Sequence, residues 1–471
     1  MPRTKRSSIE TAKPTVAPNL ATAASGPHAS EIASVDQASM LKAKKKSKAA
    51  QDNSTSKSKT KRKPKDSKAE EGLKQDAPSE VRQEPTSSIR PSEEPITQTQ
   101  VAARAQPCKD GTDMLKTWRE QIQEARAQKA KLRIVGGKSK SWYGNAFERT
   151  NGQENHQIAE LCTEEYVGVI EYEPSELYVQ VRAGTPLQEL TRLLKRHGQM
   201  LAFEPPLFGL TATVGGMLAC GLSGPRRAYA AAMKDHVLGV GFISGRAELL
   251  RFGTKVIKNV AGYDVSRLMV GSRASLGVIT DVTLKVIPLP QVECSLVFAA
   301  SEQDAMQMLQ RWAGQCLPIS ASCYYAGRLT LRLSGLAEVV KQTHQKLGGV
   351  RIDGDDAFWE SLREQQHHFF HAEPELSLWR LSLPSTAPVA DFRCKTLLEW
   401  GGAQRWVWTL ERPETVRSYA LKHRGHATLF RSREKDVSVF TPVSAAQSKI
   451  QERICTVFDP DGIFDLGQWR S

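Results

Sequence analysis

Residues 205–227 read PPLFGLTATVGGMLACGLSGPRR and constrain the fold more than any other stretch, because they are dense in glycine and small side chains yet poor in charge. Glycine lets backbone N–H groups approach a ligand without an intervening Cβ, and nearby hydroxyls add hydrogen-bond donors. The residues of this kind are Thr211, Thr213, Gly215, Gly216, Gly221, Ser223 and Gly224. The run favours either a surface on which an extended ligand lies against backbone, or a tightly packed loop, which glycine serves equally well.

Two further glycine-bearing segments favour the ligand-binding interpretation. Residues 136–140 (GGKSK) directly follow a strand expected at 132–135, and their lysines would balance a diphosphate. Residues 259–264 (NVAGYD) continue through Gly271 and Gly277. Neither G-x-G-x-x-G at the start of a helix nor G-x-x-x-x-G-K-[ST] is present, so Rossmann and P-loop sites are excluded. The three segments together predict a cofactor site of another kind.

The first hundred residues differ in composition from the rest of the chain. They contain no Phe, Trp or Tyr, and hold 19 Lys and Arg against 12 Asp and Glu, which gives +7, half of the net charge of +14. Because these few apolar groups cannot offset the entropy of ordering the backbone, we expect a disordered basic low-complexity tail over 1–110. A solvated extension, an arm for an anionic surface and a true start at Met114 all remain open. Because no aromatic residues are interleaved for base stacking, no nucleic-acid partner is expected.

The apolar pattern indicates neither membrane insertion nor secretion. No run approaches 18 apolar residues, and the N-terminus lacks a charged start followed by an apolar stretch. The eight cysteines are scattered without a C-x-x-C pair, which fits reduced thiols in the cytoplasm. This spacing also excludes the usual iron–sulfur and zinc ligand runs, so another polypeptide must hold any cluster that works with this chain.

Hydrophobic periodicity predicts two α+β regions. In the first, helices are expected over 112–131 and 186–197, and strands over 132–135, 167–172, 177–183, 235–243, 247–252 and 278–287. In the second, strands are expected over 292–299, 328–333, 376–383, 406–409 and 427–430, and helices over 304–314 and 336–347. Prolines 288 and 290 mark the boundary. The second region is expected to form an antiparallel sheet with helices on one side.

The three glycine segments also carry a family resemblance. GGKSKSWYG, PPLFGLTATVGGMLACGLSGPRR and KNVAGYDVSRLMVGS with LGVITDVTLKVIPLP resemble the vanillyl-alcohol-oxidase-type, or PCMH-type, FAD-binding domain. The combination of FEPP, GLSGPRR and KNVAGYD is similar, more narrowly, to the FAD-binding subunits of bacterial glycolate oxidases. The resemblance is strong over 112–290 and looser to the C-terminus. It implies a PCMH-type FAD-binding domain of two α+β subdomains at 111–290, followed by a smaller α+β cap domain at 291–471.

The resemblance also implies which residues hold FAD. The diphosphate would lie against residues 136–140, the middle and ring of the cofactor against 205 and 211–224, and backbone contacts would come from 262 and 276–279. The implied set is Gly136, Gly137, Lys138, Ser139, Lys140, Pro205, Thr211, Thr213, Gly215, Gly216, Gly221, Ser223, Gly224, Gly262, Leu276, Gly277, Val278 and Ile279. Some relatives tether FAD through a histidine just after the paired glycines; Lys138 stands there in this chain, which implies non-covalent FAD.

Two departures from the family pattern affect the expected site. Ala274 and Ser275 replace the usual Gly-Thr, so a Cβ at Ala274 would crowd the cofactor or need a shifted backbone. Near the C-terminus, DPDGIFDLGQW replaces the usual Asn-Pro-Gly followed by a basic residue. The contact between the C-terminal end and the flavin is therefore in doubt, although the fold is not.

The second region lacks the residues that related hydroxy-acid dehydrogenases use. Their GHxGDGNxH-like stretch corresponds here to residues 425–431 (GHATLFR), in which GDGN and the second histidine are missing. His426 alone is more typical of a packed, hydrogen-bonded histidine than of a ligand. No catalytic residue is therefore predicted from the sequence.

Other polar residues of this region leave alternatives open. His367 and His371 would share one face of a helix at metal-ligand spacing, with His368 beside them, but no H-E-x-x-H motif is present. A surface or subunit contact is the favoured interpretation, and no metal is expected. Arg380 and Arg431 are candidates to bind a carboxylate or to form structural ion pairs.

The resemblance implies an FAD-binding subunit of a glycolate oxidase complex, which oxidises glycolate to glyoxylate and passes electrons through flavin to an iron–sulfur subunit. The missing histidines favour substrate oxidation at a sister flavin subunit. The alternatives are a self-sufficient FAD-dependent D-2-hydroxy-acid dehydrogenase and a scaffold with structural flavin. The chain would be cytoplasmic, or peripheral at the inner membrane through its partner subunits.

Overall fold

The computed structural model divides the chain into two compact units, Met1–Pro91 and Ser92–Ser471. The described residues are 106–107, 113–145, 158–254, 264–371, 373, 375–390, 392, 394–432 and 437–467. All of them lie in the second unit. The tail expected over 1–110 lies outside the described residues except for the short strand β1, Gln106–Pro107.

The first part of the described chain begins with an amphipathic helix and a parallel strand pair. Helix α3 (Asp113–Gln128), predicted over 112–131, buries an apolar stripe of Leu115, Trp118, Ile122 and Ala125. It is followed by β2 (Leu132–Val135), which pairs in parallel with β3 (Ala159–Cys162). The predicted helix and strand are therefore confirmed, and the Gly-Gly segment follows the end of β2 directly.

A six-stranded antiparallel sheet forms the second layer of this part, in the order β1-β8-β7-β9-β5-β4. Its remaining strands are β4 (Val169–Glu173), β5 (Tyr178–Arg182), β7 (Val237–Ile243), β8 (Leu249–Gly253) and β9 (Val278–Lys285). The shorter elements are α4 (Leu187–Arg196), β6 (Gln199–Met200), α5 (Val214–Cys220), α6 (Arg227–Ala230), a 3-10 turn (Met233–Asp235), α7 (Val265–Leu268) and β10 (Ile287–Pro288). The strands predicted over 235–243 and 247–252 are confirmed as β7 and β8, which form an antiparallel hairpin. Side chains from β5, β7, β9, α4 and α5 share one apolar core.

An eight-stranded antiparallel sheet organises the second part, in the order β14-β11-β13-β12-β16-β17-β15-β18. Its strands are β11 (Val292–Ala299), β12 (Ile319–Tyr325), β13 (Arg328–Gly335), β14 (Val350–Ile352), β15 (Ser377–Ser382), β16 (Lys395–Glu399), β17 (Gln404–Thr409) and β18 (His426–Arg431). The helices are α8 (Glu302–Ala313), α9 (Ala337–Leu347), α10 (Asp356–Arg363) and α11 (Pro413–Lys422), with 3-10 turns at His368–Phe370 and Trp400–Gly402. The predicted antiparallel sheet is confirmed.

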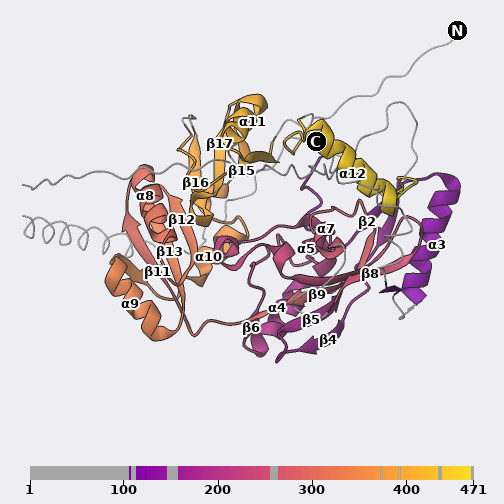
Figure 1. Ribbon diagram of the computed structural model, residues 1–471, viewed down its shortest axis with the longest axis horizontal. Coiled ribbons are helices and arrows are strands. Elements are labelled where there is room, and N and C mark those ends of the chain that lie inside the picture. Colours follow the sequence, from indigo (N-terminus) through magenta and orange to yellow (C-terminus); the bar gives the residue numbers. More distant parts are fainter. Residues whose placement is uncertain are drawn as a thin grey trace, which may run out of the picture. The chain divides into compact units, whose positions relative to one another are not determined.

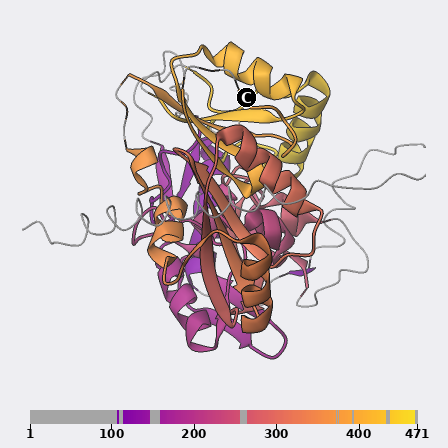
Figure 2. The same cartoon turned by 90° about the vertical axis from the view of Figure 1, so that its left-hand side faces the viewer.

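The two faces of this sheet have different neighbours. Helices α8 and α9 share an apolar cluster with one face, and α11 shares another. The opposite face packs with α10 and with Tyr143 and Leu222 of the first part. In Figure 2 the orange and yellow strands of this sheet lie in front of the magenta elements of the first part. Side chains that alternate along the strands therefore point in turn toward the first part and away from it.

Buried ion pairs connect the first part of the described chain, which contains the six-stranded sheet, to the second part, which contains the eight-stranded sheet. Glu204 accepts hydrogen bonds from Arg332 Nη2 at 2.8 Å and from Arg226 Nε at 3.3 Å. Arg226 also pairs with Glu293 of β11. The paired arginines hold the pKa of the Glu204 carboxyl below its ordinary value, against the opposing effect of burial. Breaking such a pair leaves an uncompensated buried charge, so the network fixes residues 204–226 against the sheet.

The C-terminal segment returns to the first part. Helix α12 (Ala445–Phe458) lies above α7 in Figure 1. Its Phe458 ring packs edge-on against Phe242 of β7, with ring centroids 5.5 Å apart. Ile463 and Phe464 join the cluster under α3. Within the described ranges, no helix is long and apolar enough to cross a bilayer.

Candidate cofactor and substrate sites

A cavity of about 120 Å³ lies between β2 and helix α5. Seven of the residues predicted to hold a cofactor line it: Gly136, Gly137, Lys138, Ser139, Lys140, Thr213 and Gly216. Other lining residues are Ala219 and Cys220 of α5, and Arg273 and Ala274. Tertiary structure thus brings predicted site residues from two of the three glycine segments to one cavity, with Arg273 and Ala274 from the third segment beside them.

Close approach of these two segments requires the paired glycines. A Cβ on Gly137 would lie 1.5 Å from the carbonyl oxygen of Thr211, and the Thr211 hydroxyl donates a hydrogen bond to the Gly137 carbonyl. A Cβ on Gly136 would lie 2.9 Å from Thr213 Oγ1. The two interpretations of the glycines are therefore compatible, because the same residues pack two loops together and expose backbone to a cavity.

Neighbouring glycines of α5 have different surroundings. Gly215 donates its N–H to the Ala183 carbonyl at 2.7 Å, and a Cβ there would lie 2.8 Å from Ala183 Cβ. Gly216 lines the cavity, and a Cβ there would meet only Thr213 Oγ1, at 3.1 Å. Thr213 caps the helix by accepting the N–H of Gly216. Gly215 serves packing, whereas Gly216 leaves space in the cavity.

The other sequence-predicted residues between 205 and 224 do not line this cavity. Gly221 ends α5 with a φ of 66° and touches Gly271. Ser223 and Gly224 line a separate cavity of about 30 Å³ that faces the eight-stranded sheet. Pro205 is buried. The cofactor contacts expected from these residues remain predictions.

The third predicted segment is only partly described. Gly262 lies outside the described residues. Leu276 lines a larger cavity, while Gly277, Val278 and Ile279 are buried at the start of β9. Gly277 has a φ of 149°, and a Cβ there would lie 2.5 Å from the Ile243 carbonyl oxygen. Packing against β7 is the structural reason for this glycine.

The lysines of the GGKSK segment differ in burial. Lys140 is buried, and its Nζ donates to the Leu207 carbonyl at 2.9 Å. Burial lowers the pKa of Lys140 and raises that of the neighbouring Cys220 thiol. Lys138 is exposed, and its Nζ pairs with Glu160 at 2.8 Å. Lys140 is thus the lysine built into the cavity.

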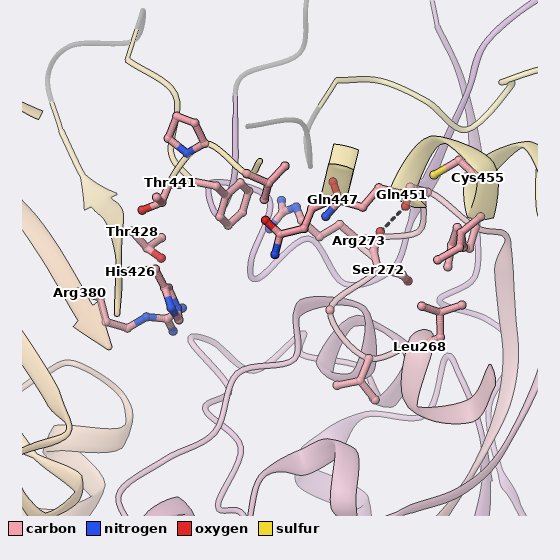
Figure 3. Close-up of a pocket in the computed structure, with 18 of the residues that line it drawn as sticks. Leu268, Ser272, Arg273, Arg380, His426, Thr428, Thr441, Gln447, Gln451 and Cys455 are labelled. Carbon is pink, nitrogen blue, oxygen red and sulfur yellow. Dashed lines mark hydrogen bonds between the residues drawn. The ribbon is translucent and has the colours of Figure 1, made fainter. Parts of the chain in front are cut away.

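The larger cavity, of about 620 Å³, is shown in Figure 3. It lies between the 268–276 segment, α12 and the strands β15 and β18. Arg380, His426 and Thr428 lie together on one side, and Leu268 and Ser272 on the other. The cavity therefore has a polar, cationic end at the eight-stranded sheet.

The cationic end contains Arg380 but not Arg431. The Arg380 Nη2 donates to the Tyr143 hydroxyl at 3.1 Å. Burial lowers the pKa of His426, and the charges of Arg380 and Arg227 lower it further. His426 is therefore neutral near pH 7, beside two arginines. The Arg431 guanidinium bonds instead to the Phe370 carbonyl and to Gln365 Oε1, at 3.0 and 2.8 Å, as a structural group.

The histidine trio does not form the expected helical face, so that prediction is wrong. His367 precedes the 3-10 turn His368–Phe370 with a ψ of 142°, and its side chain accepts the N–H of Phe369. Phe369 and Phe370 are both buried, and burying two consecutive rings favours a tight turn of the backbone over a regular helix. Burial and the two neighbouring histidines lower the pKa of His367 to about 4. No group of three or more His, Cys, Asp or Glu side chains within the described ranges is placed to hold a metal.

Sequence analysis missed one buried acid of the second sheet. Glu399, at the end of β16, lines the 30 Å³ cavity with Arg380, Ser223 and Gly224. Its Oε2 accepts from Trp406 Nε1 at 2.7 Å and from Gln404 Nε2 at 2.9 Å. Burial raises the pKa of Glu399 to about 7. A lone Glu in an apolar strand carries no motif, so only the fold reveals its position.

The α+β fold and the glycine-lined cavity are those of an FAD-binding protein. Residues 116–253 match the FAD binding domain family. The fold is similar to that of alkyldihydroxyacetonephosphate synthase, with a TM-score of 0.51, 13% identity and coverage of 74% of each chain. That likeness supports the fold alone.

The narrower relationship comes from sequence. The chain is 41% identical to the glycolate oxidase subunit GlcE of Escherichia coli (strain K12), over 74% of this chain and 95% of that protein. It therefore belongs to the GlcE family of glycolate oxidase subunits. A more distant relative is a D-lactate dehydrogenase of Archaeoglobus fulgidus, 35% identical over 29% of this chain and 31% of that protein. Glycolate oxidase subunit GlcD of Bacillus subtilis is 23% identical over 44% of this chain and 49% of its own length.

Proposed function

We propose that this chain is the FAD-binding subunit of a glycolate oxidase complex that oxidises glycolate to glyoxylate and passes electrons through FAD to a separate iron–sulfur subunit. The observation that carries the proposal is the similarity to GlcE over almost the whole of that protein. The complex acts in the cytoplasm, or at the inner membrane through its partner subunits.

The residues of the glycine-lined cavity fit an FAD diphosphate. Gly136, Gly137 and Gly216 leave the backbone uncovered, and Lys140 supplies a buried positive charge. Bound FAD supplies a two-electron acceptor that can release electrons singly. In this proposal the other sequence-predicted residues contact the remainder of the cofactor, chiefly through residues 211–224 and 276–279.

The proposed FAD is non-covalent. Of the described residues that line the glycine cavity, none is histidine or tyrosine. The thiol of Cys220 has a pKa raised by burial, and a protonated thiol is a poor nucleophile. The yellow chain should therefore release its flavin on acid precipitation, and colour that stays on the precipitate would contradict this proposal.

In this proposal, substrate oxidation takes place mainly at a sister flavin subunit of the same complex. Oxidising glycolate removes a proton from its hydroxyl and a hydride equivalent from carbon, which requires a base close to the flavin. His426 is neutral, but the partner residues of the GHxGDGNxH-like motif are missing from its strand. This chain therefore holds a flavin that relays electrons.

A self-sufficient D-2-hydroxy-acid dehydrogenase is the second candidate. The observation that favours it is the cationic end of the 620 Å³ cavity, where Arg380 lies beside His426 and near Arg227. A guanidinium matches the geometry of a carboxylate. In this alternative, Arg380 would bind the substrate carboxylate.

Anaerobic addition of glycolate to the isolated, FAD-loaded chain distinguishes the two candidates. A relay subunit keeps its oxidised flavin spectrum, whereas a self-sufficient dehydrogenase bleaches within its turnover time. The assembled complex serves as the positive control. Failure of the assembled complex to oxidise glycolate would refute the proposal that this chain belongs to a glycolate oxidase complex.

A further inference from the structure

Arg273 lies in the turn between α7 and β9 and lines both the glycine cavity and the 620 Å³ cavity. Its Nε and Nη1 atoms are buried and have no hydrogen-bond partner among the described residues. Buried polar groups are almost always hydrogen-bonded, and a charged group carries a larger penalty when it is not. The position of this guanidinium therefore needs an explanation.

Packing, rather than an ion pair, holds the guanidinium in place. It lies over the Tyr143 ring at 5.0 Å and near the Phe440 ring at 6.0 Å. Gly144 approaches so closely that a Cβ there would lie 2.3 Å from Arg273 Nη2. Arg273 and Ala274 both have left-handed backbone, with φ of 53° and 65°. Such conformations cost energy in non-glycine residues and persist where the surroundings impose them.

The charges around Arg273 leave its own charge uncompensated. Burial lowers the pKa of Arg273, and the groups that oppose this effect are the Cys220 thiol and the Tyr143 hydroxyl rather than a carboxylate. Lys140 is a second buried cation at the same cavity wall, and the Cys220 thiol and, less strongly, the Glu364 carboxylate act on its charge. The described cavity thus presents two buried cations and calls for an anion.

We propose that Arg273 is a counter-ion of the FAD diphosphate, acting together with Lys140. The inference rests on the proposed function. A diphosphate diester carries two negative charges, which the two cations would match, and guanidinium binds phosphate oxygens with charge-assisted hydrogen bonds. Arg273 is in this view a binding residue for the cofactor, on a turn that lies far in sequence from the GGKSK segment.

The test uses the full-length chain stripped of flavin and titrated separately with FAD and with riboflavin, which has the same ring system but no phosphate. Arg273→Met should weaken FAD binding by about 10–100-fold, the usual value of hydrogen bonds to a charged group. Riboflavin binding should not change. Arg273→Lys retains the charge and should lie between the two in FAD affinity.

Arg126→Met is the matched control. Arg126 does not line the glycine cavity, and its Nε lies 2.7 Å from Asp461 Oδ2 at the surface. Removing it takes one cation from the chain and should leave FAD affinity within a few-fold of wild type, as expected for an exposed pair. An equal loss in both arginine variants would show a general charge effect and overturn the specific role of Arg273.

Thermal unfolding gives a second readout that a purely structural arginine would not produce. Without flavin, Arg273→Met should unfold at the wild-type temperature or higher, because the variant lacks an unpaired buried charge. Its stabilisation by added FAD should be smaller than that of wild type.

Three further outcomes would overturn the inference: unchanged FAD affinity in Arg273→Met, an equal loss of FAD and riboflavin affinity, or a lower unfolding temperature of the flavin-free variant with normal FAD binding. A wild-type chain that binds no FAD would instead refute the proposed function.

Discussion

The glycine-lined cavity and the face of the eight-stranded sheet that packs against the first part both carry polar groups. Only the polar groups of the cavity can be recognised from the sequence. The cavity is built from backbone, so close approach of two loops demanded glycine at Gly136 and Gly137, and Gly216 keeps the cavity open. The sheet face is built from single side chains on separate strands, such as Arg380 on β15 and Glu399 on β16. A site made of backbone leaves a dense local signal, whereas a site made of scattered side chains leaves none.

The largest expected effect comes from two adjacent glycines, which test whether the glycine-lined cavity is built from backbone. Gly216→Val should abolish FAD retention while the chain still folds, because the new side chain would enter the cavity. Gly215→Val should instead destabilise the fold by about 1–3 kcal/mol through overpacking against Ala183. The measurements are flavin absorbance per protein and the free energy of unfolding. Normal flavin content in a folded Gly216→Val protein would show that the cofactor does not use this cavity.

The pH dependence of stability tests whether the site on the sheet is built from single side chains such as Glu399. Its folded-state pKa is raised to about 7 from an ordinary 4.5, so folding favours the neutral carboxyl. The resulting stabilisation is complete below about pH 4.5 and is lost as pH rises through about 7. Between pH 5 and 8, wild type should lose about 1–3 kcal/mol of unfolding free energy relative to Glu399→Gln. Urea unfolding at each pH measures the difference, and parallel curves would mean that Glu399 titrates normally.

His426 tests whether the cationic end of the large cavity performs chemistry. His426→Ala should reduce glycolate oxidation by the flavin-loaded complex less than about tenfold, since the histidine lacks the rest of its motif. Removing a general base typically costs about 10²–10⁴-fold. Turnover is measured per intact FAD, so that poor folding is not mistaken for lost chemistry. A thousandfold loss at full flavin loading would assign substrate oxidation to this chain.

Removing residues 1–100 should have the smallest effect. The segment contains no aromatic residue and few apolar groups that could join a core, and the cut leaves β1 in place. FAD affinity and unfolding temperature should match those of the full chain. A clear loss of either would show that the basic segment contributes to the folded protein.

Local pattern was enough to predict many of the elements. The apolar stripe of α3, the β7–β8 hairpin and the strand at 292–299 follow directly from side-chain periodicity, because each element buries one face or one stripe. Pattern failed where long-range packing decided the conformation. The helix α5 inside the glycine run and the 3-10 turn at His368–Phe370 are examples, since their shape depends on Ala183 and on two buried rings.

The sequence by itself indicated where backbone approaches backbone closely, because glycine at such points cannot be replaced without a steric penalty, and its family resemblance indicated FAD. Tertiary structure alone decided which glycine faces the cavity, and it brought Arg273 and Lys140 to one wall although they lie far apart in the sequence. It also set the protonation of Glu399, since a pKa depends on desolvation and neighbouring charges that arise only when distant strands pack together.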